Sequence, residues 1–232
     1  MLKKQIRIKN LNINYRVSGQ GKPFLILHGW GSNSEKWEKV INLLSFKFQV
    51  FAPDLPGFGE SEVMKDPWQI KDFIDFLKEF VEKLDLKNFY LLGHSFGGSL
   101  ALKYNSEFKV NKLFLVAPSL VRKNTLKKRI FSLKIPCPFF CKKIIYALFL
   151  KNTDYPLYRG AMKETLKNVL IDLSHLKPLS ETILIWGKKD KITPFSNSKL
   201  IKKDVLETIP QAGHAIEIDT PDLLVEKILN NL

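Results

Sequence analysis

The chain has 232 residues, of which 45% are hydrophobic and 26% are charged, and its formal net charge is +14. This composition excludes a disordered chain, a coiled coil and collagen, and two cysteines are too few for a disulfide scaffold or a cysteine-based zinc site. The sequence shows no signal peptide and no apolar run of the ~20 residues that span a bilayer, so we expect a cytoplasmic protein without a transmembrane segment.

The positive charge permits nucleic-acid binding but does not by itself indicate it. The sequence contains no helix-turn-helix, no zinc finger and no basic strand interleaved with aromatic residues, which are the devices that turn charge into specific binding. We therefore interpret the charge as a lysine-rich solvated surface and expect no specific nucleic-acid partner.

The predicted elements alternate between strands and helices. Residues 5–9 and 12–17 alternate with period two and predict an antiparallel hairpin joined by Asn10-Leu11. Six short apolar runs predict strands buried on both faces, at residues 24–27, 48–52, 89–92, 112–117, 182–186 and 205–209. Helical patterns lie between or after them, at residues 34–44, 68–84, 96–104 and 222–229. This order predicts a mostly parallel α/β sheet with right-handed crossovers.

The alternation breaks between residues 120 and 180. This stretch has helical pieces and prolines but no convincing core strand, and it carries thirteen Lys and Arg against three acidic residues. We expect a helical cap, or lid, at residues 120–180, inserted into a core formed by residues 1–119 and 181–232.

The strongest motif is Gly93-His94-Ser95-Phe96-Gly97, which follows a predicted strand and precedes a predicted helix. This context is typical of a nucleophile elbow, a turn so tight that its flanking positions have no room for a side chain. The turn exposes the serine hydroxyl above the sheet edge, where the helix N-terminus favours negative charge. Ser95 is therefore the candidate nucleophile.

A serine hydroxyl needs a base, and the base needs a buried carboxylate to orient it. Among four histidines, His214 follows the last predicted strand and so lies at the carboxyl edge of the sheet, where ligands bind. Asp190 lies just past the strand at 182–186 and is the candidate acid, with turn capping as its plain structural alternative.

A tetrahedral intermediate needs at least two N–H donors. We predict one from Phe96, directly after the nucleophile, and one from Trp30 in the glycine-rich turn His28-Gly29-Trp30-Gly31. His28, Asp54 and Ser61 are interpreted as residues that brace loops.

Together these residues resemble the α/β-hydrolase superfamily, and the resemblance covers the chain except for residues 120–180. It implies an eight-stranded, mostly parallel sheet flanked by helices, a small helical cap inserted before the penultimate core strands, no cofactor and no metal. The chain is similar to the group that holds carboxylesterases, lactonases and carbon–carbon hydrolases of ring-cleavage products, although the last often carry Asn where this chain has His94. The matching motifs are His28-Gly29-Trp30-Gly31, Asp54-Leu55-Pro56-Gly57-Phe58-Gly59-Glu60-Ser61, Gly93-His94-Ser95-Phe96-Gly97-Gly98, Trp186-Gly187-Lys188-Lys189-Asp190 and Gly213-His214.

Seven aromatic residues of the predicted cap are candidates for substrate binding, with packing of the cap onto the core as the alternative. They are Phe131, Phe139, Phe140, Tyr146, Phe149, Tyr155 and Tyr158. Such a pocket is apolar, which favours small to medium acyl or aryl esters as substrates.

The sequence thus predicts a serine hydrolase that cleaves carboxylic esters through an acyl-enzyme, as a monomer or homodimer. Hydrolysis of a carbon–carbon bond or of a lactone by the same three side chains is the first alternative. A ligand-binding protein without catalysis is the second alternative, and a nucleic-acid binder driven by charge alone is the third. Neither of these two needs an aligned base and acid, so the complete set of three side chains argues against both.

Overall fold

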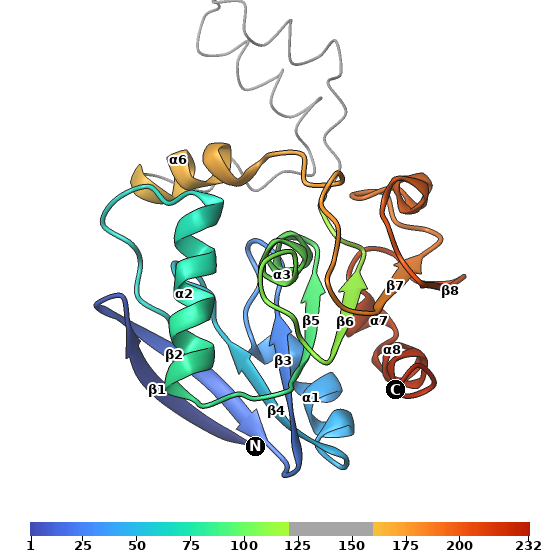
Figure 1. Cartoon of the computed structure of the whole chain (residues 1–232), viewed down its shortest axis with the longest axis horizontal. Helices are drawn as coiled ribbons and strands as arrows, with labels where there is room; N and C mark the ends of the chain where they lie inside the picture. Colours follow the sequence, from blue (N-terminus) through green and yellow to red (C-terminus); the bar gives the residue numbers. More distant parts are fainter. Residues whose placement is uncertain (121–159) are drawn as a thin grey trace, which may run out of the picture.

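The computed structural model describes residues 1–120 and 160–232, and their centre is one eight-stranded sheet (Figure 1). The strand order is β1-β2-β4-β3-β5-β6-β7-β8. The pairs β1–β2 and β2–β4 are antiparallel and every other pair is parallel, which confirms the predicted mostly parallel sheet. The strands are β1 (Leu2–Ile8), β2 (Leu11–Ser18), β3 (Lys22–Leu27), β4 (Phe48–Pro53), β5 (Tyr90–His94), β6 (Lys112–Val116), β7 (Thr182–Gly187) and β8 (Val205–Ile209).

The first hairpin forms as expected, but its turn lies one residue earlier than predicted. Lys9 and Asn10 are the turn residues, with φ of 47° and 63°, and Leu11 pairs with Ile8. Leu11 is 8% exposed and belongs to the core. Burial of the leucine side chain therefore draws it into the strand, and Asn tolerates the left-handed conformation better than Leu does.

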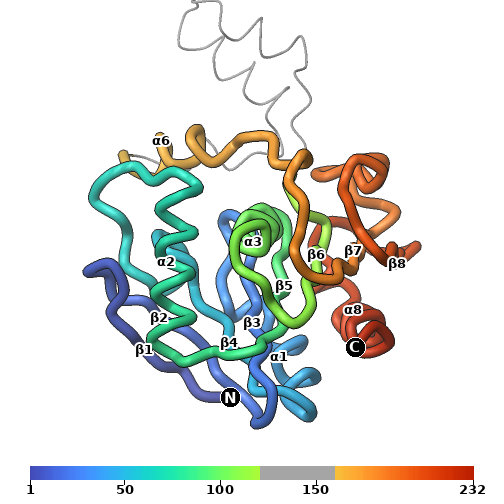
Figure 2. Tube along the Cα trace, viewed as in Figure 1, coloured from blue at the N-terminus to red at the C-terminus, as the bar shows by residue number. Residues whose placement is uncertain are grey.

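Helices cover both faces of the sheet (Figures 1 and 2). Helices α2 and α3 pack together, and α1 packs with α8 on the opposite face. Strands β3, β5, β6 and β7 lie between these layers, so their side chains are buried on both faces, as their continuous apolar runs predict. The helices are η1 (Glu35–Trp37), α1 (Glu38–Leu44), α2 (Ile70–Lys83), α3 (Phe96–Asn105), α6 (Gly160–Val169), η3 (Phe195–Leu200), α7 (Ile216–Asp219) and α8 (Pro221–Leu229).

The helix predicted at 34–44 is divided into a 3-10 turn and α1, and Ser34 makes no side-chain cap. Its N–H instead donates to Asp54 Oδ1 at 2.6 Å, which ties it to the loop after β4. The short helices η3 and α7 escaped prediction because six and four residues are too few for a helical period to show. Helix α7 matters below because it directly follows His214.

One helix of the inserted stretch lies within the described residues. Figure 1 shows α6 lying across the end of the molecule toward which the central strands point. The N–H of Trp68 donates to Thr165 Oγ1 at 2.8 Å, and the N–H of Leu173 donates to Leu120 O at 2.9 Å. These contacts join α6 and the segment that follows it to the core.

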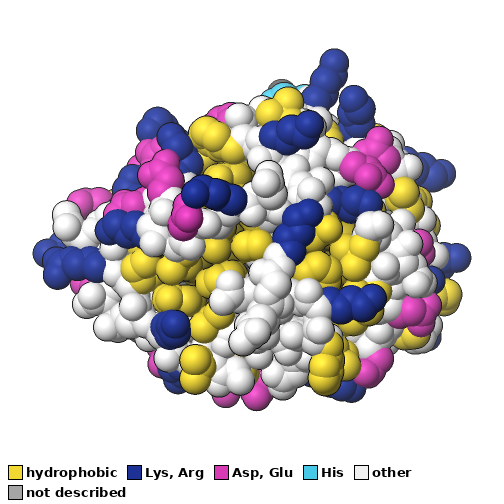
Figure 3. Space-filling view, turned by 60° about the horizontal axis from the view of Figure 1, so that its bottom comes forward, with side chains coloured by type: hydrophobic (Ala, Val, Ile, Leu, Met, Phe, Trp, Pro, Cys, Tyr) yellow, Lys and Arg dark blue, Asp and Glu magenta, His cyan; other side chains and the backbone are white. Residues whose placement is uncertain are grey.

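The excess of positive charge falls largely outside the described residues. Ten of the 37 Lys and Arg, but only one of the 23 Asp and Glu, lie in residues 121–159. On the face drawn in Figure 3, Lys and Arg side chains are interspersed with acidic ones. Across the described ranges 1–120 and 160–232, no helix combines the length and the hydropathy that a membrane span needs.

Candidate active site

Ser95 occupies a strained turn between β5 and α3. Its φ of 51° and ψ of −114° are unusual for a residue with a side chain. Two backbone hydrogen bonds fix this turn: Ser95 N–H donates to Val116 O, and Ser119 N–H donates to Ser95 O, both at 3.0 Å. The neighbouring strand β6 and the segment that follows it thereby hold the turn, and a strained conformation kept by its surroundings is typical of a functional residue.

Glycines flank this turn because no larger residue fits. A Cβ added at Gly93 would lie 2.2 Å from the Gly97 carbonyl oxygen, and one added at Gly97 would lie 2.2 Å from the Leu27 carbonyl oxygen. Both obstacles are backbone atoms, which cannot rotate away as a side chain can. The packing of α3 onto β3 and β5 therefore requires glycine, as the sequence predicts.

Replacing Gly97 with alanine is expected to destabilise the fold by about 2–4 kcal/mol, because the new methyl group must displace the backbone of β3. Urea unfolding monitored by circular dichroism measures the loss of unfolding free energy. Gly213→Ala is the matched control, since its added Cβ would meet only a side-chain atom, Asp219 Oδ2, at 3.5 Å. Equal stability of the two variants would contradict this account of the turn.

The structure brings Ser95, His214 and Asp190 together in one chain of hydrogen bonds. Ser95 Oγ lies 3.0 Å from His214 Nε2, and His214 Nδ1 lies 2.8 Å from Asp190 Oδ2. The His214 side chain is 14% exposed and that of Asp190 is fully buried. Because an ionised carboxylate only accepts hydrogen bonds, His214 carries its proton on Nδ1, which leaves Nε2 free to accept the proton of Ser95 Oγ.

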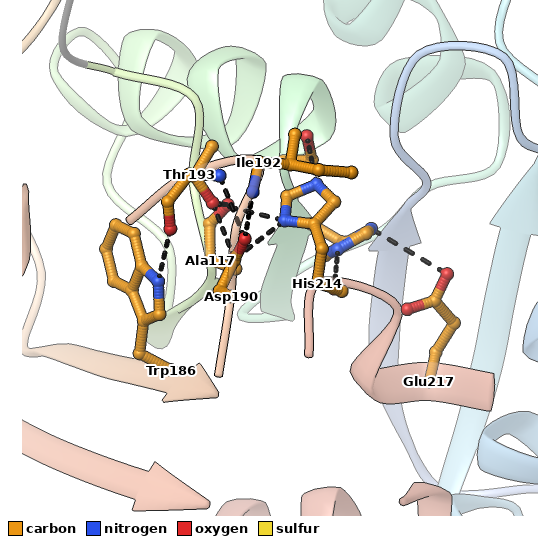
Figure 4. A network of polar contacts seen from close by, with 9 residues as sticks. Ala117, Trp186, Asp190, Ile192, Thr193, His214 and Glu217 are labelled. Atoms are coloured by element: carbon orange, nitrogen blue, oxygen red, sulfur yellow. Dashed lines mark hydrogen bonds and ion pairs between the residues drawn. The ribbon is translucent and has the colours of Figure 1, made fainter. Parts of the chain in front are cut away.

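Asp190 is held from several sides (Figure 4). The N–H groups of Ile192 and Thr193 donate to its Oδ1 at 2.8 and 2.9 Å, and the Thr193 hydroxyl donates to Oδ2 at 2.8 Å. Burial raises the pKa of Asp190, but the hydrogen bonds from His214 and Thr193 outweigh it, so the pKa is lowered. The carboxylate is thus ionised when His214 needs it.

Thr193 is a site residue that the sequence analysis missed. Its hydroxyl oxygen lies 3.1 Å from His214 Nδ1, so it contacts both the candidate base and the candidate acid. The Trp186 indole N–H fixes its backbone by donating to Thr193 O at 2.9 Å. The one available signal was the spacing Asp190-Lys191-Ile192-Thr193, which is typical of a turn in which Asp accepts backbone N–H bonds.

The two predicted oxyanion donors belong to neighbouring segments. Phe96 is the first residue of α3, where a backbone N–H has no partner within the helix. The turn that carries Trp30 passes beside the nucleophile, since a Cβ added at Gly29 would lie 3.2 Å from Ser95 Cβ. The Trp30 and Phe96 rings meet edge to face at 5.3 Å. This places both residues next to Ser95.

His28, Asp54 and Ser61 hold loops, as their sequence context suggests. His28 Nε2 accepts the Leu55 N–H at 2.9 Å, and its Nδ1–H donates to Gly29 O at 2.7 Å. Asp54 Oδ2 accepts the Glu60 N–H at 2.9 Å, and the Ser61 hydroxyl donates to Asp54 O at 2.7 Å. These bonds tie the turn at residues 28–31 to the loop after β4.

The protonation state of the buried His28 predicts how the free energy of unfolding depends on pH. Burial lowers the pKa of His28 from 6.5 to about 4, although its bond to Gly29 and the nearby Asp54 charge oppose the shift. Between pH 6.5 and 4 the unfolded chain therefore binds more protons, and the contribution of neutral His28 is lost as pH falls through this window. The difference in unfolding free energy between wild type and His28→Gln is expected to shrink by roughly 2–3 kcal/mol from pH 7 to pH 4.

Urea titrations at several pH values measure this difference, and the exposed His175, replaced by Gln, is the control. A wild-type minus His28→Gln difference that does not change with pH would show that His28 carries no such linkage.

The seven aromatic residues predicted to bind substrate lie outside the described residues, as do Cys137 and Cys141. A cavity of about 160 Å³ is lined by polar residues such as Arg16, Asn33 and Asp54, and none of the three side chains of the Ser95–His214–Asp190 chain borders it. Within the described residues no group of three or more His, Cys, Asp or Glu is placed to hold a metal ion.

Comparisons with known proteins show which family and fold this chain resembles. Residues 22–132 match the family model described as alpha/beta hydrolase fold. An uncharacterised Mycobacterium tuberculosis protein is 32% identical over 91% of this chain and 75% of its own length. An AB hydrolase superfamily protein of Bacillus subtilis is 28% identical over 84% of this chain and 86% of its own. An esterase from Exiguobacterium antarcticum has a similar structure, with a TM-score of 0.76, 22% identity and 99% of both chains covered; at this identity the likeness concerns the fold.

Proposed function

Because the chain belongs to the α/β-hydrolase family, we propose that it is a serine hydrolase that cleaves carboxylic esters through an acyl-enzyme. One observation supports the proposal above all: the continuous hydrogen-bonded chain from Ser95 Oγ through His214 to Asp190. A nucleophile, a base and an orienting acid in this geometry are what acyl transfer requires.

In the first half of the reaction Ser95 Oγ attacks the ester carbonyl carbon, and its proton moves to His214 Nε2. The oxygen of the tetrahedral intermediate takes the negative charge and accepts hydrogen bonds from the N–H groups of Trp30 and Phe96. Asp190 stabilises the positive imidazolium through Nδ1–H. The intermediate collapses, the carbon–oxygen bond of the ester breaks, and His214 Nε2 gives its proton to the departing alcohol.

In the second half water attacks the acyl carbon of the Ser95 ester. His214 Nε2 takes the proton of the water, and the same two N–H groups hold the second tetrahedral intermediate. Collapse returns this proton to Ser95 Oγ and releases the carboxylic acid. The cycle therefore consumes one ester and one water and restores the enzyme.

The proposed substrates are small to medium esters with an acyl or aryl group. We further propose that residues 120–180 form a cap over Ser95 and that Phe131, Phe139, Phe140, Tyr146, Phe149, Tyr155 and Tyr158 bind the substrate. The position of α6 in Figure 1, toward the carboxyl ends of the strands, supports a cap on this side. A cytoplasmic location and a monomeric or homodimeric state stay predictions from the sequence.

The proposal is tested with p-nitrophenyl esters of increasing acyl length, aryl esters, lactones and a vinylogous keto acid of the kind produced by ring cleavage. We expect turnover of the esters to exceed that of the other classes, and we expect a fluorophosphonate probe to label Ser95 in the folded protein. Faster cleavage of the keto acid would favour the carbon–carbon alternative on the same residues. A folded protein that the probe fails to label would contradict catalysis by Ser95.

A further inference from the structure

A second histidine and carboxylate lie buried behind His214, and the proposed reaction does not use them. His94 ends β5 and is 4% exposed, and Glu217 lies on α7 and is 3% exposed. The Glu217 Oε1 lies 3.8 Å from His94 Nδ1, an ion-pair distance rather than a hydrogen bond. Figure 4 shows the Glu217 carboxylate pointing from α7 toward the part of the network that holds His214.

The contacts of His94 fix where its proton lies. His94 Nε2 is 2.9 Å from the main-chain carbonyl oxygen of His214. A carbonyl oxygen only accepts hydrogen bonds, so Nε2 carries a proton. In a neutral imidazole Nδ1 is then bare and faces a carboxylate, which is a repulsive pairing of two acceptors. One further proton, on Nδ1 or on the carboxyl, turns this repulsion into attraction.

Because both groups are buried, the presence of this proton has a large effect on their energy. Within the described part of the chain, neither His94 Nδ1 nor Glu217 Oε2 has a hydrogen-bond partner, and both atoms are buried. An isolated ionised group at such a place carries a large desolvation cost, whereas a pair that holds one proton has no net charge. Two buried titratable groups at ion-pair distance thus satisfy each other only when they share a proton.

The His94 ring also touches three segments of the candidate site at once. It belongs to the strand that leads into Ser95, it donates to the backbone of His214, and it contacts the turn that carries Trp30. A Cβ added at Gly29 would lie 3.2 Å from His94 Nδ1. The rings of His94 and His214 are 4.9 Å apart. His94 therefore fixes the relative positions of nucleophile, base and oxyanion turn.

The charged groups that surround His94 belong to several elements of the fold. Burial lowers the pKa of His94 and the charge of His214 lowers it further, whereas the charges of Glu217 and Asp190 and the hydrogen bond to the His214 carbonyl oxygen oppose the shift. His28 lies on the side of β3, and its own pKa is lowered in part by His94. On the opposite side Glu217 borders an open surface hollow of about 540 Å³, whose rim carries four charged residues of η1 and α1: Glu35, Lys36, Glu38 and Lys39.

We propose that His94 and Glu217 share one proton and act as a positioning pair that holds the backbone of His214 against Ser95. This inference rests on the proposed function, since it assigns the pair a role in aligning the base. It is consistent with a fold in which α7 follows His214 at once, so that Glu217 and the catalytic base move together. Without that proton, Nδ1 and the carboxylate repel each other and the hold on the His214 backbone weakens.

The test compares wild type, Glu217→Leu, Glu217→Gln and the exposed control Glu226→Gln on a p-nitrophenyl ester at neutral pH. Glu217→Leu leaves Nδ1 without a polar neighbour and is expected to lower kcat about tenfold with KM nearly constant, and Glu217→Gln, whose amide can donate to Nδ1, is expected to restore most of it. Glu226→Gln is expected to match wild type. A folded Glu217→Leu variant with the kcat of wild type would overturn the proposal.

Two substitutions of His94 separate positioning from packing. His94→Phe removes the donor to His214 O and is expected to lower kcat about tenfold at every pH, and His94→Gln, which supplies an amide donor, is expected to restore most of it. If His94→Phe does not fold, ¹⁵N spectra of the wild-type imidazoles decide the question. They are expected to show His94 protonated at Nε2 at neutral pH, and a tautomer protonated only at Nδ1 would overturn the proposal. The spectra need no substrate, so the pair is tested even if no ester is cleaved and the proposed function fails.

Discussion

Ser95→Ala is expected to lower kcat for ester hydrolysis by about 10⁴- to 10⁶-fold while the fold and KM change little. The variant removes the oxygen atom that forms the acyl-enzyme in the proposed reaction, and the remaining N–H donors and substrate binding would supply what activity persists. Steady-state kinetics on the best ester of the panel, with titration by a fluorophosphonate, measures both rate and labelling.

Ser99→Ala is the matched control for this variant. Ser99 lies in α3, the helix that follows Ser95, and its hydroxyl donates to Ser119 O at 2.9 Å, away from His214. It is expected to keep activity within a few-fold of wild type and to keep its labelling. If Ser95→Ala hydrolysed esters as fast as Ser99→Ala, another group would be the nucleophile and the proposed function would be wrong.

Asp190→Asn is expected to lower kcat by about 10⁴-fold. The amide NH₂ of Asn donates where the carboxylate accepts, so His214 turns to the tautomer with its proton on Nε2. That nitrogen then cannot take the proton of Ser95 Oγ, although the distances of 2.8 and 3.0 Å in the hydrogen-bond chain need not change. The loss comes from the wrong tautomer rather than from a displaced side chain.

The control for the acid is Asp222→Asn, which alters an exposed carboxylate paired with Lys39 on the surface. Its kcat is expected to match wild type, because a surface ion pair contributes little even to stability. A loss of less than tenfold in Asp190→Asn, with an unfolding midpoint close to that of wild type, would mean that His214 is oriented by another group, and Thr193 would then be the first residue to examine.

Much of the fold was predictable because the apolar runs of the central strands are local features. A strand buried between two helical layers needs apolar side chains on both faces. The strands at residues 24–27, 89–92 and 182–186 can therefore be predicted from their own sequence, without knowing which strands they pair with. The turn of the first hairpin was misplaced by one residue because Leu11 fits either a turn or a strand by its position. The packing of its side chain into the core decides between them.

The Ser95, Asp190 and His214 positions were predictable for a related reason. Carboxyl ends of parallel strands meet at one edge, so residues that follow different strands are brought together by the topology alone. Thr193 and Glu217 were not predictable, because their contacts depend on how the short segments after β7 and β8 bend. The sequence also could not predict that His94 contacts three segments of the site, because in the sequence His94 is only the residue before Ser95.

The sequence by itself determined the α/β alternation, the glycines that an exceptionally tight turn demands, and the three chemically reactive side chains at the ends of separate strands. These follow from short-range rules of sterics and periodicity, which act within a few residues of the chain. Only the tertiary structure decided the tautomer of His214, the hydrogen bonds from Thr193 to Asp190 and the proximity of His94 to Glu217. Hydrogen bonds of this kind depend on distances of a few tenths of an ångström between distant segments, and those distances are set by the packing of the whole core.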